Sequence, residues 1–158
     1  MKLVDNIAIF LLSVWLIVWG ALSVFVIPIH NIETYFAALS IVAGVMLFFR
    51  LNDPKPNVNV GMLLLCLWLI LWGVLPVFNI DFPGSEFALT FLAVTAALFF
   101  LPTIVVGERN FYTVGLFFLA IWLLASQLFP LLGFQVQSNN VILALLATMS
   151  AFLLLLGM

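Results

Sequence analysis

The chain has 158 residues, of which 67% are hydrophobic and 6% are charged, and its formal net charge is −2. A soluble domain carries about 25% charged residues, so this sequence has too little polar surface to coat a water-soluble globule. A small negative net charge also argues against nucleic acid as a partner. We therefore expect an integral membrane protein.

Six apolar runs follow one another along the chain, each of roughly the 18–22 residues that cross a hydrocarbon core of about 30 Å as a helix. The first run contains Trp15 and Trp19 and is followed by no small-residue cleavage site, so it reads as a membrane helix rather than a signal peptide. The alternation typical of a membrane β-barrel is absent. The sequence predicts an all-α, polytopic, single transmembrane domain over residues 1–158, with helices at about 6–27, 33–50, 58–79, 86–106, 111–132 and 140–157.

A repeat of 53–54 residues groups these helices into three tandem hairpins, at about 1–53, 54–107 and 108–158. Residues 13–25 (SVWLIVWGALSVF) match residues 66–78 (CLWLILWGVLPVF) at eight of thirteen positions. A fainter third copy begins at residue 120 (AIWLL), which makes Trp15, Trp68 and Trp122 equivalent. Such a repeat predicts internal pseudo-symmetry.

The second helix of each hairpin carries three small residues at spacing i, i+3, i+4, which places them on one helix face. Small residues let helix backbones approach closely in lipid. Each of these helices is therefore predicted to have a close-packing face: Ser40, Ala43 and Gly44; Ala93, Ala96 and Ala97; Ala147, Ser150 and Ala151.

The distribution of charge predicts an orientation. All four basic residues, Lys2, Arg50, Lys55 and Arg109, lie on the N-terminal tail or between hairpins. The hairpin tips instead carry His30, Glu33, Asp81, Glu86, Gln135 and Gln137. Because short cytoplasmic loops are enriched in Lys and Arg, we expect both termini in the cytoplasm and the protein in the bacterial inner membrane.

Five tryptophans fall near the middle of their helices, although Trp usually lies at the membrane interface. One interpretation is a flat, apolar ligand site for a quinone, carotenoid, chlorophyll or acyl chain. The other, which the sequence favours, is helix packing around a pseudo-threefold or layered core. In both, a buried indole N–H needs a hydrogen-bond acceptor. The residues are Trp15, Trp19, Trp68, Trp72 and Trp122.

Gln127 is the only amide side chain deep in a predicted helix, and it aligns with Gly20 and Gly73 of the other two repeats. Amides in membrane helices usually hydrogen-bond a neighbouring helix. We expect that structural role, and the alternative is a polar contact to a ligand or a partner subunit.

Residues with catalytic or metal-binding chemistry are few. The chain has one histidine, His30, near the first hairpin tip, and one cysteine, Cys66, inside an apolar run. Its carboxylates all lie at helix ends or in loops, whereas proton and ion pathways usually place them inside the membrane. Nucleophile, zinc and phosphate-loop motifs are absent. We therefore expect neither an enzyme nor a metal site, and the sequence identifies no cofactor.

Gly20, Pro28 and Gly44 place a glycine in the first helix, a proline at the hairpin turn and a glycine in the second helix. This pattern of glycine and proline positions resembles that of the HdeD-like small membrane proteins, which have three tandem hairpins in a somewhat longer chain. The tryptophan pairs have no counterpart in that pattern. The later repeats depart from it, with Pro83 at the second turn, Ala97 for the second glycine and Gln127 for the third repeat's first glycine. The resemblance implies a stress-linked membrane protein with no catalytic residues to carry over.

These observations lead to a ranked expectation about function. The first is a non-enzymatic accessory subunit or homo-oligomer that acts through lateral helix packing, with lipids and other membrane subunits or itself as partners. The second is a small transporter or channel for neutral or apolar solutes, built from repeats. The third is a binder of a lipid-soluble cofactor such as a quinone or pigment.

Overall fold

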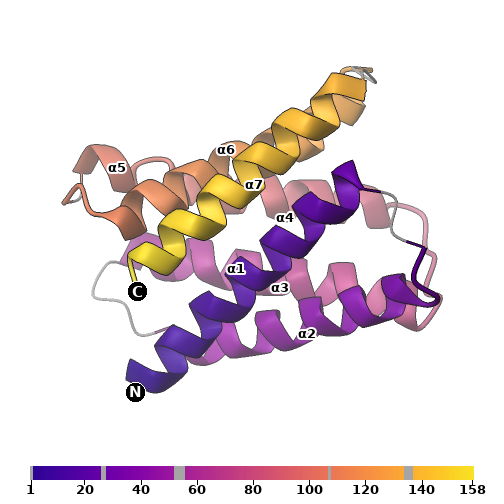
Figure 1. Cartoon of the computed structure of the whole chain (residues 1–158), viewed down its shortest axis with the longest axis horizontal. Coiled ribbons are helices and arrows are strands. Elements are labelled where there is room, and N and C mark those ends of the chain that lie inside the picture. The colour runs from indigo at the N-terminus through magenta and orange to yellow at the C-terminus, as the bar shows by residue number, and fades with distance from the viewer. Residues whose placement is uncertain (1, 26–27, 52–55, 107, 134–136) are drawn as a thin grey trace.

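Every regular element in the described part of the chain is a helix (Figure 1). The computed structural model describes residues 2–25, 28–51, 56–106, 108–133 and 137–158. The elements are α1 (Lys2–Val24), α2 (Ile32–Phe49), α3 (Pro56–Val77), α4 (Ser85–Phe100), α5 (Thr103–Val106), α6 (Phe111–Leu131) and α7 (Gln137–Leu156). The predicted all-α fold class is confirmed.

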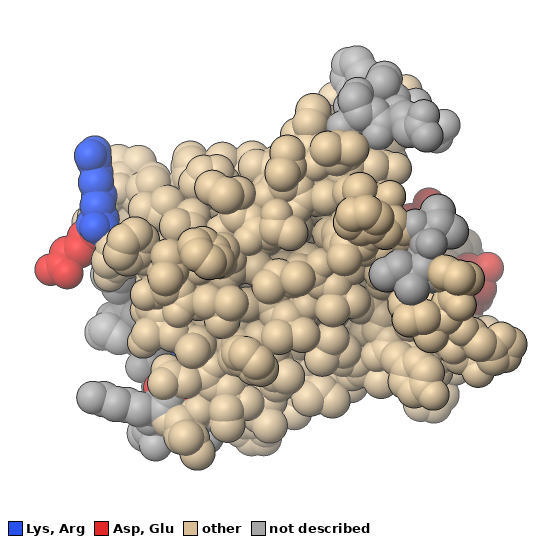
Figure 2. Space-filling model, in the orientation of Figure 1, with Lys and Arg blue, Asp and Glu red and all other residues tan. Residues whose placement is uncertain are grey.

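Five helical segments are long and apolar enough to cross a membrane: Asp5–Val24, Ile32–Phe49, Val58–Val77, Ser85–Val106 and Phe111–Leu131. The side chains of α7 are described from Asn140 onward, and Asn140–Leu156 is an apolar but shorter segment. Figure 2 shows charged side chains at the two ends of the molecule and an uncharged surface between them. These features are those of an integral membrane protein.

One predicted helix is wrong in its continuity. The run at 86–106 was expected as one helix, but the structure ends α4 at Phe100 and starts the short α5 at Thr103. Pro102 lies between them, and a proline ring clashes with the carbonyl of residue i−4 and lacks a backbone N–H. The amide of Leu101 still bonds the Ala97 carbonyl, and the next turn restarts from the Pro102 carbonyl. The remaining helices begin and end within a few residues of the prediction, and residues 26–27, expected at the end of the first helix, lie outside the described residues.

The six long helices pack in a closed ring. Each packs against the next in the order α1, α2, α3, α4, α6, α7, and α7 packs back against α1. Figure 1 shows the two chain termini at the same end of the molecule, which we call the terminal end. The connections from α1 to α2 and from α3 to α4 lie at the opposite end, which we call the tip end.

The small-residue faces hold this ring together. The Ser40 hydroxyl of α2 donates to the Leu69 carbonyl of α3 at 2.6 Å, and the Ser150 hydroxyl of α7 donates to the Gly115 carbonyl of α6 at 3.1 Å. A Cβ atom on Gly44 would lie 3.1 Å from the Cys66 carbonyl oxygen, so the missing side chain permits that approach. All nine residues of the three predicted faces are buried within the chain.

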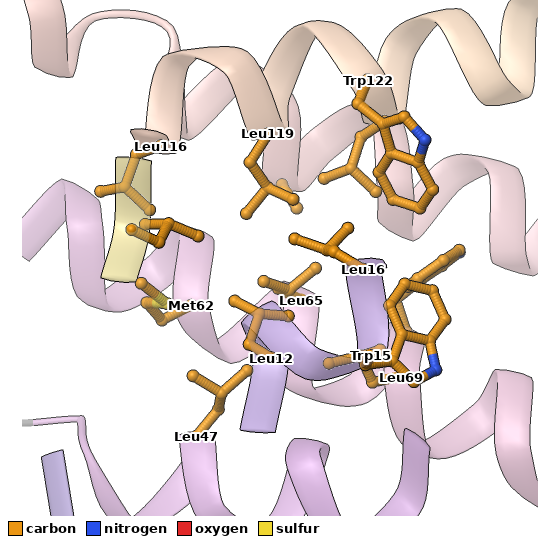
Figure 3. Close-up of a cluster of buried hydrophobic side chains, with 14 of the residues drawn as sticks. Leu12, Trp15, Leu16, Leu47, Met62, Leu65, Leu69, Leu116, Leu119 and Trp122 are labelled. Atoms are coloured by element: carbon orange, nitrogen blue, oxygen red, sulfur yellow. The ribbon is translucent and has the colours of Figure 1, made fainter. Parts of the chain in front are cut away.

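Leucines from several helices fill the interior on the terminal side of the tryptophans. Figure 3 shows Leu12 of α1, Leu65 of α3, and Leu116 and Leu119 of α6 pointing toward one another, with Trp15 and Trp122 at one side of the group. Side chains in such a core interlock at the density of an organic crystal. The interior of the ring is therefore filled by apolar side chains.

Candidate functional site

All five tryptophans belong to one aromatic cluster, which also contains Phe36 of α2. Trp15 lies at its centre. Its ring stacks on Phe36 at 5.2 Å between centroids and meets Trp68, Trp72 and Trp122 edge-on at 5.7, 5.6 and 5.9 Å. These are favourable separations and orientations for aromatic pairs. Trp19 joins through Trp122, at 4.9 Å.

Trp15, Trp68 and Trp122 form a triangle in which each ring touches the other two. The third side, from Trp68 to Trp122, is 6.2 Å, and the three interplanar angles are 88°, 80° and 84°. The three side chains are 1%, 3% and 1% exposed. Because α1, α3 and α6 each supply one indole, the triangle joins three helices that are not adjacent in the closed ring of helices.

The indole nitrogens of this triangle have no hydrogen-bond acceptor within the described part of the chain. Figure 3 shows the Trp15 and Trp122 nitrogens pointing away from one another, so the two N–H groups do not converge on a shared site. A buried donor without a partner lowers stability. The indole rings are thus held by shape and aromatic contacts, and the described residues provide none of the expected acceptors.

A partly open pocket of about 680 Å³ lies beside the cluster, between α3, α4 and α6. That volume is within the range of small-molecule sites. Its walls are largely apolar, with three polar side chains among them. The lining residues are Trp68, Trp72, Glu86, Phe87, Leu89, Thr90, Gln127, Pro130 and Leu131.

A hydrogen bond crosses one wall of the pocket. The Thr90 hydroxyl of α4 donates to Oε1 of Gln127 on α6 at 3.1 Å. This bond uses one oxygen lone pair of the amide, and the two N–H bonds of Gln127 make no hydrogen bond among the described residues. An amide nitrogen is a double donor. The pocket therefore offers donors on a side chain that is only partly buried.

The helix pairs α1–α7 and α3–α2 contain a glycine where the pair α6–α4 contains Gln127. A Cβ on Gly20 would lie 3.2 Å from the Ala144 carbonyl oxygen, and a Cβ on Gly73 would lie 2.6 Å from that of Ala37. Backbone thus packs directly on backbone at these two positions.

The third pair is less closely packed than the other two, and the pocket lies against it. In sequence, Ala37, Thr90 and Ala144 are spaced by 53 and 54 residues, as are Gly20, Gly73 and Gln127. An amide and a hydroxyl therefore stand where the other pairs have glycine and alanine.

The tip end, where the pocket lies, is acidic. Glu33, Asp81 and Glu86 are its described carboxylates, and all three are exposed. On the face seen in Figure 2, acidic atoms appear at this end without basic ones. Arg50 and Arg109 are the only Lys or Arg residues whose side chains are described, and neither of them, nor the exposed His30, lines the pocket.

Arg50 is instead tied to the other end of the bundle. Its guanidinium Nη1 donates to the Tyr112 hydroxyl at 3.0 Å, and its Cζ lies 4.9 Å from the centroid of the same ring. A cation over an aromatic face is held by the ring quadrupole as well as by the hydrogen bond.

The structure separates the predicted site residues into two groups. Trp68, Trp72 and Gln127 line the pocket, whereas Trp15, Trp19 and Trp122 belong to the cluster and are not in the pocket lining. His30 is exposed, and Cys66 is buried. No group of three metal-ligating side chains occurs among the described residues.

Sequence reasoning missed the pocket contributions of Thr90 and Glu86. The sequence does single out Thr90, because the repeat spacing aligns it with Ala37 and Ala144, and Thr90 is the one polar residue of the three. Glu86 carries no such signal, since Glu33 occupies the matching position of the first repeat.

Comparison with protein-family models, curated proteins and solved structures finds no match to this chain. The resemblance to the HdeD-like proteins therefore stays a prediction.

Proposed function

We propose that this chain is a non-enzymatic membrane protein that binds a lipid-soluble small molecule in the pocket between α3, α4 and α6. The observation that carries the proposal is the hydrogen-bonded pair of Thr90 and Gln127 in the pocket wall. Ligand sites are typically apolar concavities with a few polar groups that fix the orientation of the ligand. This pocket has that composition, and exposed apolar residues, Phe87 and Leu131, border it.

The proposal includes a three-hairpin, pseudo-symmetric architecture with both termini in the cytoplasm. Three findings support it: the closed ring of helices, the mutual contacts of Trp15, Trp68 and Trp122, and the two termini at one end. In that architecture Gln127 marks the point at which the symmetry is broken. The described basic residues at the terminal end agree with a cytoplasmic location of that end.

The two other functions expected from the sequence have less support. Lateral assembly was inferred from small-residue faces, and those faces are used inside the chain, so they supply no argument for a partner. A channel needs a hydrated path, and the described interior of the ring is filled by leucines and tryptophans. Both stay predictions.

Photolabelling in lipid nanodiscs tests the binding proposal. The probe is an uncharged long-chain alcohol that carries a diazirine near its hydroxyl group, and peptide mass spectrometry locates the adducts. We expect saturable adducts on the pocket walls, at Thr90, Gln127 and their neighbours, that an excess of the plain alcohol removes. Adducts on lipid-facing residues should rise linearly with probe concentration.

A matched pair of variants makes the test specific. Thr90→Phe places a ring in the pocket, and Thr95→Phe makes the same change on the same helix at a residue that bonds back to the Phe91 carbonyl and does not line the pocket. We expect Thr90→Phe to abolish the saturable labelling and Thr95→Phe to preserve it. Labelling without a saturable component, or equal saturable labelling in both folded variants, would overturn the proposal.

A further inference from the structure

We infer that the ligand of this pocket is an amphipathic cation: a quaternary ammonium or protonated amine carried on an apolar body. The inference rests on the proposed function and adds the chemical class of the ligand. Its starting point is the charge of the pocket. Glu86 is the one ionisable residue among the described residues of the lining, so this part of the site presents a carboxylate and no cation.

The surroundings of the pocket reinforce this charge. Glu33 and Asp81 are the other described carboxylates of the tip end. Neither the described arginines, Arg50 and Arg109, nor the histidine of the tip end, His30, lines the pocket. Fields of one sign around a concave site concentrate counter-ions there. An anionic headgroup would meet only repulsion from Glu86, whereas a cation is attracted.

Aromatic side chains supply the second half of cation recognition. Trp68, Trp72 and Phe87 line the same pocket as Glu86. A cation over the face of an aromatic ring, Trp best of all, is attracted by the ring quadrupole, and quaternary ammonium ligands are recognised in this way. Trp72 is the half-buried member of the tryptophan pair, so its ring is the more accessible one.

The remainder of the pocket suits an apolar body. Leu89, Pro130 and Leu131 line it, and Phe87 and Leu131 are 76% and 68% exposed, respectively. An alkyl or aryl group attached to the cation therefore leaves the pocket along apolar side chains rather than through water.

Glu86 has a second role that a test must separate from ligand binding. It lies in the first turn of α4, where a carboxylate is stabilised by the helix dipole. Glu33 lies in the first turn of α2 in the same way. Only Glu86 lines the pocket, so Glu33 is a matched control in the same chain.

Competition against the uncharged photoprobe in nanodiscs of an uncharged galactolipid, which carries no ammonium group of its own, tests the inference. The competitors are an alkyltrimethylammonium and its uncharged isostere, in which carbon replaces nitrogen. Their bilayer concentrations are set from partitioning into empty nanodiscs. We expect the cation to displace the probe at about tenfold lower bilayer concentration than the isostere. Glu86→Gln should reduce that preference to the part that the aromatic walls supply, and Glu33→Gln should retain it in full.

The outcomes separate this inference from the function on which it rests. Equal displacement by cation and isostere in the unmodified protein overturns the cation assignment. If Thr90→Phe still abolishes the saturable photolabelling in that case, the proposed binding function stands. A cation preference that is undiminished in Glu86→Gln, or that falls equally in Glu33→Gln, also overturns the cation assignment, since the carboxylate in the pocket would then make no specific contribution. If the photoprobe shows no saturable site at all, the binding function itself fails.

Discussion

Replacing Trp15 by alanine should be the most destabilising single change in the aromatic cluster. Trp15 is 1% exposed and contacts four other aromatic rings, whereas Trp19 is only partly buried and, among the described residues, contacts one aromatic ring, that of Trp122. In lipid the unfolded helices stay in an apolar solvent, so the loss is one of packing rather than of transfer from water. In soluble cores Trp→Ala costs about 3–5 kcal/mol for transfer and cavity together, so for Trp15→Ala we expect the lower end of that range, about 3 kcal/mol.

For Trp19→Ala we expect about 1–2 kcal/mol, because aromatic pairs contribute about 0.5–1.5 kcal/mol each and less cavity is left. Trp15→Phe is a useful third variant, since it keeps a ring and removes an indole N–H that has no partner in the described structure. It should cost less than Trp15→Ala by at least about 1 kcal/mol. Reversible unfolding in mixed lipid–detergent micelles measures all three. Equal losses for Trp15→Ala and Trp19→Ala would refute the packed triangle.

Three further predictions concern other parts of the ring. Cys66 is buried, so a membrane-permeant maleimide should label it only after denaturation, and rapid labelling of the folded protein would contradict its placement. Gly73→Ala should destabilise the protein by about 1–3 kcal/mol, and more than Gly20→Ala, because its added Cβ meets backbone at 2.6 Å rather than 3.2 Å; the same unfolding assay ranks the two. Arg50→Gln should lower the free energy of unfolding by about 1 kcal/mol. A double-mutant cycle with Tyr112→Phe separates the hydrogen bond to the hydroxyl from the contact with the ring. If the guanidinium acts through the hydroxyl, Arg50→Gln should have almost no effect in the Tyr112→Phe background.

Sequence reasoning recovered the helices because their signal is local. A run of apolar residues long enough to cross a bilayer needs no tertiary information, and five such segments appear in the structure. The break at Pro102 was equally local and was missed, although the residue before a proline disfavours helical geometry. The repeat grouped Trp15, Trp68 and Trp122 in sequence, whereas the contacts between their rings depend on how three separate helices pack.

The pocket illustrates what a single sequence does not contain. Its walls come from α3, α4 and α6, and no local pattern shows that Glu86 and Gln127 border the same space. The sequence feature nearest to a prediction of the pocket was Gln127, since the corresponding positions of the other two repeats are glycines. Its position became informative only when Thr90 was found opposite it.

The double variant Thr90→Ala, Gln127→Gly would make the third helix pair resemble the other two, and it separates binding from folding. The change removes one hydrogen bond between membrane helices, which averages about 0.6 kcal/mol, and permits the backbone contact that Gly20 and Gly73 make with their neighbours. We expect stability within about 1 kcal/mol of the original and loss of saturable photolabelling.

That result would mean that the polar pair is not needed to hold the ring together, and that its contribution is to keep a polar space open between α4 and α6. A double variant that unfolds easily while retaining the ligand would reverse the assignment: Thr90 and Gln127 would be structural residues, and the affinity would belong to the aromatic walls. Stability and photolabelling measured together therefore decide whether Thr90 and Gln127 serve ligand binding or the packing of α4 on α6.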